Sequence, residues 1–278
     1  MKRLIKTSAR LVKQSLAARG PKVAFIHIPK CGGSSLKNAL GRKLDPFSRY
    51  TFKYEQAHES ARLTSNKTFL NTNVVDDFEQ LKFLLCYHLN GDYRFVHGHF
   101  PVTDKILQHY IVRYQFVTMM RDPQDRWKSN YLFNKGLPDP DSRRLPSKNF
   151  DGTLEDEFSH VIESGMGLLM GTTTTAFLSG RYPVDQHDAI TLGEQATKNL
   201  TLFSAVGKLE NLDAFSQQLT HVTGKTLSVG TQNKTVALYT GQALDAYERT
   251  REFLNSESIA NEIKALVKAD TALYDSID

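Results

Sequence analysis

The feature that most constrains this chain is an apolar segment that runs directly into a glycine-rich turn. Residues 23–28, Val-Ala-Phe-Ile-His-Ile, predict a buried strand, and the turn Pro29-Lys-Cys-Gly-Gly33 leads into a helix that starts at Ser34 or Ser35. Glycines let backbone N–H groups approach an anion, a helix N-terminus adds partial positive charge, and Lys30 adds a full charge. The segment therefore predicts a phosphate-binding loop; the alternative is a tight turn with a surface lysine.

The order of residues in this loop differs from that of nucleoside-triphosphate-binding loops. A Walker loop reads G-x-x-x-x-G-K-[ST], with the lysine after the glycines and a hydroxyl that contacts magnesium. Here the lysine comes first, in P-K-C-G-G-S-S. That order resembles the 5′-phosphosulfate loop of sulfotransferases that use 3′-phosphoadenosine 5′-phosphosulfate (PAPS). The resemblance implies a donor-binding set that consists of Lys30, Cys31, Gly32, Gly33, Ser34 and Ser35.

A second strand, turn and helix are predicted at residues 114–133. Apolar and aromatic residues predict the strand, and an Asp-Pro pair suits the N-cap and first turn of the helix. The run R-D-P-x-x-R-x-x-S-x-Y-x-F, which begins at Arg121, resembles the 3′-phosphate motif of the same sulfotransferases. The resemblance implies that Arg121 and Ser129 bind the 3′-phosphate of the donor. The alternative is an ion pair between Arg121 and Asp125, with Ser129 on the helix surface.

Between these segments lies Tyr93-Arg-Phe-Val-His-Gly-His-Phe-Pro101. Side chains alternate along a strand, so His97 and His99 are expected to point the same way. The stretch resembles the H-G-H sequence of the uronosyl (heparan and dermatan) 2-O-sulfotransferase branch. The resemblance implies that His99 is the general base and that His97 is its neighbour or an acceptor contact; neutral imidazole suits proton removal near pH 7. The alternatives are a metal pair, which lacks a third ligand cluster, and histidines in the core.

Two later segments resemble the same family more faintly. Residues 202–212 predict a buried strand that turns into a helix, and they are similar to the family's V-G-x-x-E turn; a plain connection is the alternative. Residues 231–235 resemble the loop that closes over the nucleotide. This resemblance implies that Asn233 and Lys234 contact the donor.

The order of the elements predicts an α/β fold: a P-loop-like parallel sheet flanked by helices, in a single domain. The expected strands cover residues 23–28, 93–97, 114–120 and 203–207. The expected helices cover residues 34–43, 75–89, 103–110, 123–133, 153–164, 193–199 and 209–221, with two more from residue 242 to the end. Strands that alternate with helices favour a parallel sheet, and such sheets bind ligands at the carboxyl ends of their strands.

Positive charge is concentrated at the N-terminus. The 278-residue chain has 35 Lys and Arg against 30 Asp and Glu, and residues 1–22 carry seven basic residues and no acidic one. The rest of the chain is nearly neutral, which argues against nucleic-acid binding. We therefore divide the chain into a basic leader, 1–21, and a sulfotransferase domain, 22–278. Residues 1–20 form either an amphipathic helix on an anionic membrane or a solvated segment.

The chain has two cysteines, Cys31 and Cys86, and they suggest reduced thiols rather than a disulfide framework. Cys31 is interpreted as a packing residue, although its position at a helix start would lower its pKa. The leader is too short and polar to span a bilayer, and no apolar signal-peptide region follows it. We therefore expect a cytoplasmic protein, with membrane association left open.

Together the motifs imply a PAPS-dependent sulfotransferase. The family mechanism is in-line displacement at sulfur: His99 takes the acceptor proton, Lys30 neutralises charge on the bridging oxygen of the leaving phosphate, and no metal is needed. The expected acceptor is a small molecule or glycan, most simply a carbohydrate or glycolipid hydroxyl. The alternatives are a P-loop-like kinase, a catalytically silent glycan-binding module on the same fold, and a metal hydrolase built on His97 and His99. Loop 134–152 is expected to bind the acceptor or to be solvated.

Overall fold

The computed structural model describes residues 20–46, 53, 56–57, 60, 77–136, 152–227 and 240–277. Nearly all of the expected leader therefore lies outside the described residues. The same is true of Asn233, Lys234 and most of loop 134–152. Among the described residues, no helix is both long enough and apolar enough to cross a bilayer.

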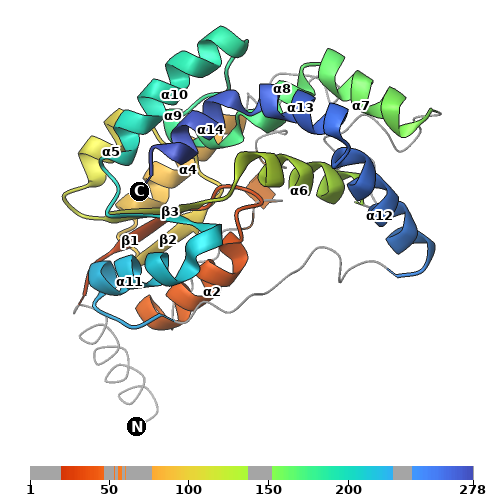
Figure 1. Cartoon of the computed structure of the whole chain (residues 1–278). Coiled ribbons are helices and arrows are strands. Elements are labelled where there is room, and N and C mark those ends of the chain that lie inside the picture. The colour runs from red at the N-terminus through yellow and green to blue at the C-terminus, as the bar shows by residue number, and fades with distance from the viewer. Residues whose placement is uncertain are drawn as a thin grey trace.

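The centre of the described structure is a four-stranded sheet in which all strands run parallel. Its strands are β1 (Val23–Ile26), β2 (Phe95–Gly98), β3 (Gln115–Met120) and β4 (Ala205–Lys208), in the order β2-β1-β3-β4 (Figure 1). The predicted parallel α/β architecture is confirmed. In the register, Ile26 pairs with Gly98 on one side and Thr118 on the other, so three strands end side by side.

Helices connect the strands and extend beyond them. They are α2 (Gly33–Leu44), α4 (Asp77–Asn90), α5 (Asp104–Tyr110), α6 (Pro123–Lys135), α7 (Leu154–Glu163), α8 (Met166–Gly171), α9 (Thr173–Ser179), α10 (Gln186–Leu200), α11 (Leu212–Thr223), α12 (Gln242–Leu254), α13 (Glu257–Leu266) and α14 (Lys268–Asp275). A short 3₁₀ helix, η1 (Leu209–Asn211), precedes α11. Two expectations were wrong: α10 begins at 186 rather than 193, and three helices rather than two follow residue 242.

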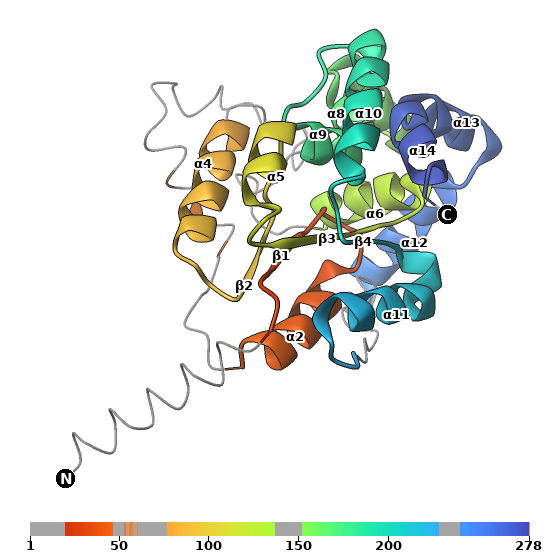
Figure 2. The same ribbon diagram turned by 90° about the vertical axis from the view of Figure 1, so that its left-hand side faces the viewer.

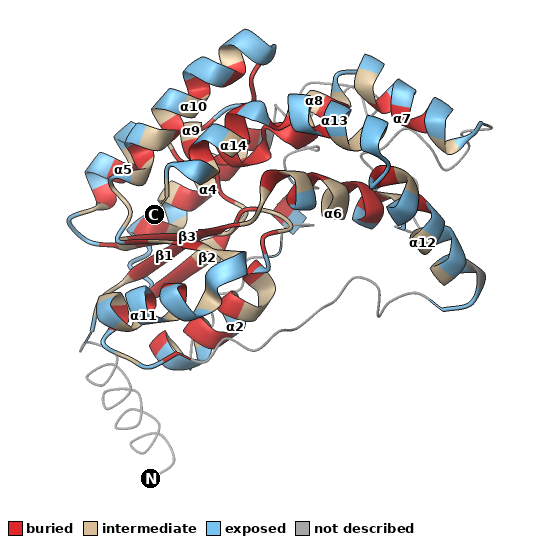
Figure 3. Cartoon of the chain, in the orientation of Figure 1, coloured by how far each residue is buried: buried red, intermediate tan, exposed pale blue. Residues whose placement is uncertain are grey.

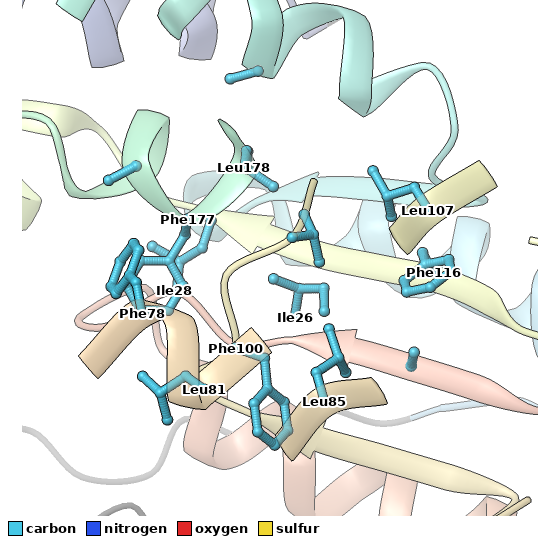
Figure 4. Close-up of a cluster of buried hydrophobic side chains, with 14 of the residues drawn as sticks. Ile26, Ile28, Phe78, Leu81, Leu85, Phe100, Leu107, Phe116, Phe177 and Leu178 are labelled. Atoms are coloured by element: carbon cyan, nitrogen blue, oxygen red, sulfur yellow. The ribbon is translucent and has the colours of Figure 1, made fainter. Parts of the chain in front are cut away.

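The two faces of the sheet are covered by different helices. α2 and α11 pack on one face, and α4, α5, α9, α10 and α14 lie on the other (Figures 1 and 2). Alternation along β1 explains this division, because Val23 and Phe25 face α2 and α11 while Ala24 and Ile26 face the second cluster. Figure 4 shows the second cluster, in which side chains of α4, α5 and α9 pack around Ile26. The strands are buried almost throughout (Figure 3).

A third apolar cluster lies beside the sheet, where α6 packs against α7, α8, α12 and α13 (Figure 1). Trp127 and Tyr131 of α6 stack with their ring centroids 5.5 Å apart. Trp127 also donates its indole N–H to the carbonyl of Gly167 at 3.1 Å. One face of α6 is thus core, as its helical spacing predicts, and its N-terminal end stays at the edge of the sheet.

A fully buried ion pair joins α14 to α6. The carboxylate of Asp270 lies 3.4 Å from the guanidinium of Arg126, and neither side chain is exposed. Asp270 also accepts backbone hydrogen bonds from Thr174 at 2.9 Å and Thr175 at 2.8 Å, while Arg126 donates to the carbonyl of Met170. These bonds fix α14, α6 and the start of α9 to one another.

Candidate functional site

The motif residues meet at the carboxyl edge of the sheet because β1 lies between β2 and β3. The glycine-rich loop follows β1, His99 follows β2, and Arg121 follows β3. Because parallel strands end at the same edge, the order of the strands places all three segments together. The sequence placed these motifs at or near the ends of strands, and the sheet brings them to one edge; their function stays a prediction.

The loop after β1 leaves the N-terminus of α2 open to an anion. Lys30 has φ +67° and Gly32 has φ +72°, so the backbone turns through two left-handed residues before the helix. Gly32 occupies the N-cap position without a side-chain cap, and the first turn contains no acidic residue. The helix starts at Gly33, one residue earlier than expected. Uncapped N–H groups at the start of a 12-residue helix are the kind of site that binds phosphate.

Lys30 lies close to a second cation. Its ammonium group is 4.0 Å from the ring centroid of Phe133 on α6. Burial, and to a smaller extent the positive charge of Arg121, lower the pKa of Lys30 to about 8. A dianionic group between the two side chains would remove this repulsion. The pair is therefore suited to an anion rather than to a cation.

Arg121, in the turn before α6, makes the ion pair with Asp125 that the sequence left as an alternative. Its guanidinium is 3.7 Å from the carboxylate of Asp125, and its side chain is 26% exposed. An exposed pair at this distance contributes little, so it does not fix Arg121 in place. Ser129 lies half-buried farther along α6 and, among the described residues, makes no hydrogen bond to Arg121. The structure thus brings Arg121 near Lys30 and leaves the role of Ser129 a prediction.

Cys31 is a packing residue. Its thiol is buried and lies 3.7 Å from the carbonyl oxygen of Pro29. Burial raises the pKa of Cys31 to about 12, so the lowering expected from its position at a helix start is wrong. An anion at this loop would meet the backbone of residue 31, because the side chain belongs to the core.

The H-G-H sequence places two histidines in different surroundings. β2 ends at Gly98, so His99 lies just beyond the strand and the alternation of side chains does not determine its direction. His97 lies within the strand, where burial and the nearby charge of Lys37 lower its pKa to about 4. His97 and Lys37 also line a groove of about 400 Å³ between α2 and the edge strand β2. His97 is therefore neutral at pH 7 and borders a space that an acceptor could enter.

The sequence interpretation missed His27, which contacts the predicted base. The ring centroids of His27 and His99 lie 4.3 Å apart, and His99 Nδ1 donates to the carbonyl oxygen of His27 at 2.6 Å. His27 follows the last residue of β1, and its ring stacks on that of Phe25; no motif in the sequence singled it out. Among the described residues, no group of three or more His, Cys, Asp or Glu side chains is arranged to hold a metal ion.

Glu210, the glutamate of the V-G-x-x-E segment, supports the turn that carries Arg121. Glu210, in η1, accepts the backbone N–H of Asp122 at 3.0 Å and the hydroxyl of Tyr274 at 2.8 Å. Asp122 in turn caps α6 by accepting the N–H of Asp125 at 2.9 Å. Glu210 therefore holds the turn that carries Arg121 against α14.

The site as a whole combines an uncapped helix N-terminus, two cations and a histidine pair at one edge of a parallel sheet. This arrangement can bind a phosphorylated ligand and can remove a proton beside it. Comparison of the chain with models of known protein families and with curated proteins finds no match.

Proposed function

We propose that the protein is a PAPS-dependent sulfotransferase that transfers a sulfuryl group to a hydroxyl of a carbohydrate or glycolipid. The observation that carries the proposal is the uncapped N-terminus of α2, with Lys30 in the loop before it and Arg121 at the end of the neighbouring strand β3. PAPS carries phosphates at both ends of its ribose, and two separated cations suit such a ligand. The histidines at the same edge supply the base that transfer to a hydroxyl requires.

The chemistry assigned to each residue follows from this placement. The 5′-phosphate would bind the N–H groups of Gly32 and Gly33, and Arg121 would hold the 3′-phosphate. The acceptor oxygen attacks sulfur as the bond from sulfur to the phosphate oxygen breaks, and the acceptor proton passes to His99. Lys30 neutralises the charge that develops on the departing phosphate oxygen. The products are the sulfated acceptor and 3′-phosphoadenosine 5′-phosphate (PAP).

The first test compares two arginines at opposite ends of the same strand. We expect Arg121→Ala to weaken PAP binding by roughly 10- to 100-fold, the loss of about 1.5–3 kcal/mol from a charge-assisted bond. Binding of adenosine 5′-phosphate, which lacks the 3′-phosphate, should change little. Arg113, which precedes β3 and pairs with Asp92 at 2.7 Å, is the matched control. Isothermal titration calorimetry measures all four affinities.

Equal losses for both nucleotides in Arg121→Ala would contradict the assignment of Arg121 to the 3′-phosphate. Tighter binding of ATP with magnesium than of PAP would favour the P-loop-like kinase instead. A screen of radiolabelled PAPS against sugars, lipids and phenols would then identify the acceptor.

The pKa of Lys30 gives a second test. Because that pKa is about 8, the ammonium group carries its charge below pH 8 and loses it above. The negative charge of the bound 5′-phosphate stabilises the ammonium form of Lys30 and raises its pKa. We therefore expect PAP affinity to fall as the pH rises through 8, with proton uptake on binding near that pH. Calorimetry in buffers of different ionisation enthalpy measures the uptake, and Lys30→Met should abolish it; uptake of the same size in that variant would assign it to another group.

A further inference from the structure

The ring of His99 is held by the backbone of His27. His99 Nδ1 lies 2.6 Å from the carbonyl oxygen of residue 27, and 72 residues separate the two in sequence. A carbonyl oxygen can only accept a hydrogen bond, so Nδ1 of His99 must carry the proton. In the neutral ring this leaves the lone pair on Nε2. The bond therefore selects one of the two tautomers.

The side chain of His27 fixes the same ring from its face. The two rings lie 4.3 Å apart with an angle of 31° between their planes, and the His27 ring also stacks on Phe25 at 5.4 Å. On another side, Phe177 meets the His99 ring nearly edge-on at 6.4 Å. Aromatic contacts at these distances favour particular ring orientations, so His99 is restrained by packing as well as by its hydrogen bond.

The absence of a side chain at Gly33, in the loop that would bind the donor, lets the His27 ring pack against that loop. A Cβ added at Gly33 would lie 2.0 Å from Cδ2 and 2.2 Å from Nε2 of the His27 ring, which is far inside normal contact. Gly33 therefore lets the start of α2 approach His27 closely. The His27 ring sits between the loop that would bind the donor and the histidine that would act as base.

His27 is unsuited to proton transfer itself. Burial, together with His99, Lys37 and His97, lowers the pKa of His27 well below its usual range. The ring is thus neutral, and it packs against the rings of Phe25 and His99. Its contribution is to orientation.

We propose that the side chain of His27 is a positioning group: its ring holds the His99 ring against the carbonyl oxygen of residue 27, and this contact keeps the proton on Nδ1 and the lone pair on Nε2. The role of His99 as base rests on the proposed function, whereas the tautomer does not. Orientation of a reactive imidazole through its second nitrogen is a general way to set which nitrogen reacts.

The experiment is long-range ¹H–¹⁵N spectroscopy of the ¹⁵N-labelled full chain without nucleotide. In the unsubstituted protein, the Nδ1 resonance of His99 should have the shift of a protonated nitrogen and Nε2 that of an unprotonated one. In His27→Leu, which keeps the carbonyl but loses the ring, both resonances should shift toward the average of the two tautomers. His27→Phe restores a flat ring and should restore the original shifts. His109→Leu, an exposed histidine of α5, is the control.

Circular dichroism first establishes that each variant is folded. A proton on Nε2 of His99 in the unsubstituted protein overturns the proposal, and this measurement needs no variant. Unchanged His99 shifts in His27→Leu overturn it as well. Failure of the protein to bind PAP, with the Nδ1–H tautomer intact, would instead count against the proposed function alone.

Discussion

Replacement of His99 by alanine is expected to lower kcat for sulfuryl transfer by roughly 10²–10⁴-fold, the usual contribution of a general base. The acceptor hydroxyl would then have to lose its proton to water as it attacks sulfur. PAP affinity should stay near its original value, since the proposed nucleotide contacts come from Lys30, Arg121 and the start of α2. Initial rates with labelled PAPS and calorimetry with PAP separate the two effects.

His97→Ala is the comparison variant, because His97 lies two residues away at the same edge. Its effect should be smaller and should appear partly in KM, as expected of a residue that borders the acceptor groove. A His99→Ala enzyme with nearly normal kcat would remove His99 from the mechanism. Asp92 could not replace it as base, because Asp92 pairs with Lys22 and Arg113 at the opposite edge of the sheet, before the strands begin.

Replacement of Asp270 by alanine should lower the free energy of unfolding by about 3–5 kcal/mol. The substitution leaves the Arg126 guanidinium buried without its counter-ion, and the backbone N–H groups of Thr174 and Thr175 lose their acceptor. Equilibrium unfolding in urea measures the loss. Glu248→Ala is the matched control: Glu248 pairs with Arg251 at 3.3 Å on the surface of α12, where an exposed pair contributes about 1 kcal/mol or less.

A double variant tests whether the unpaired charge of Arg126 causes this loss of stability. Arg126→Met with Asp270→Leu removes both charges, and it should recover part of the stability that Asp270→Ala loses. A loss of about 1 kcal/mol or less in Asp270→Ala would show that the buried pair does not stabilise the fold.

The sheet was predictable because its strands carry strong local signals. Strands β1 and β3 are apolar runs that end in a turn, and each of the four strands is followed by a helix. The helices were predicted less well where their boundaries lack glycine or proline. α13 passes into α14 at Val267, a residue with no helix-ending signal of its own. The early start of α10 was visible in retrospect, because Asp185 accepts the N–H of Asp188 as an N-cap.

The site was predictable only where its residues lie within short motifs. The Lys30 loop, Arg121 and the H-G-H histidines could be placed because each lies at or just after the end of a strand. The contacts that support them join distant segments: Arg126 meets Asp270 across 144 residues, and Glu210 meets Asp122 across 88. Such pairings depend on how helices pack in three dimensions, and no local pattern in one sequence specifies them.

Because Cys31 is buried, the loop that contains it is protected from reagents that modify thiols. Alkylating and oxidising reagents attack the thiolate, and a buried thiol with a pKa of about 12 forms very little of it at neutral pH. We therefore expect iodoacetamide or mild peroxide to leave Cys31 unmodified in the folded protein. Cys31 should stay a free thiol without a reducing agent, so the loop can keep its structure in reducing and in oxidising compartments alike.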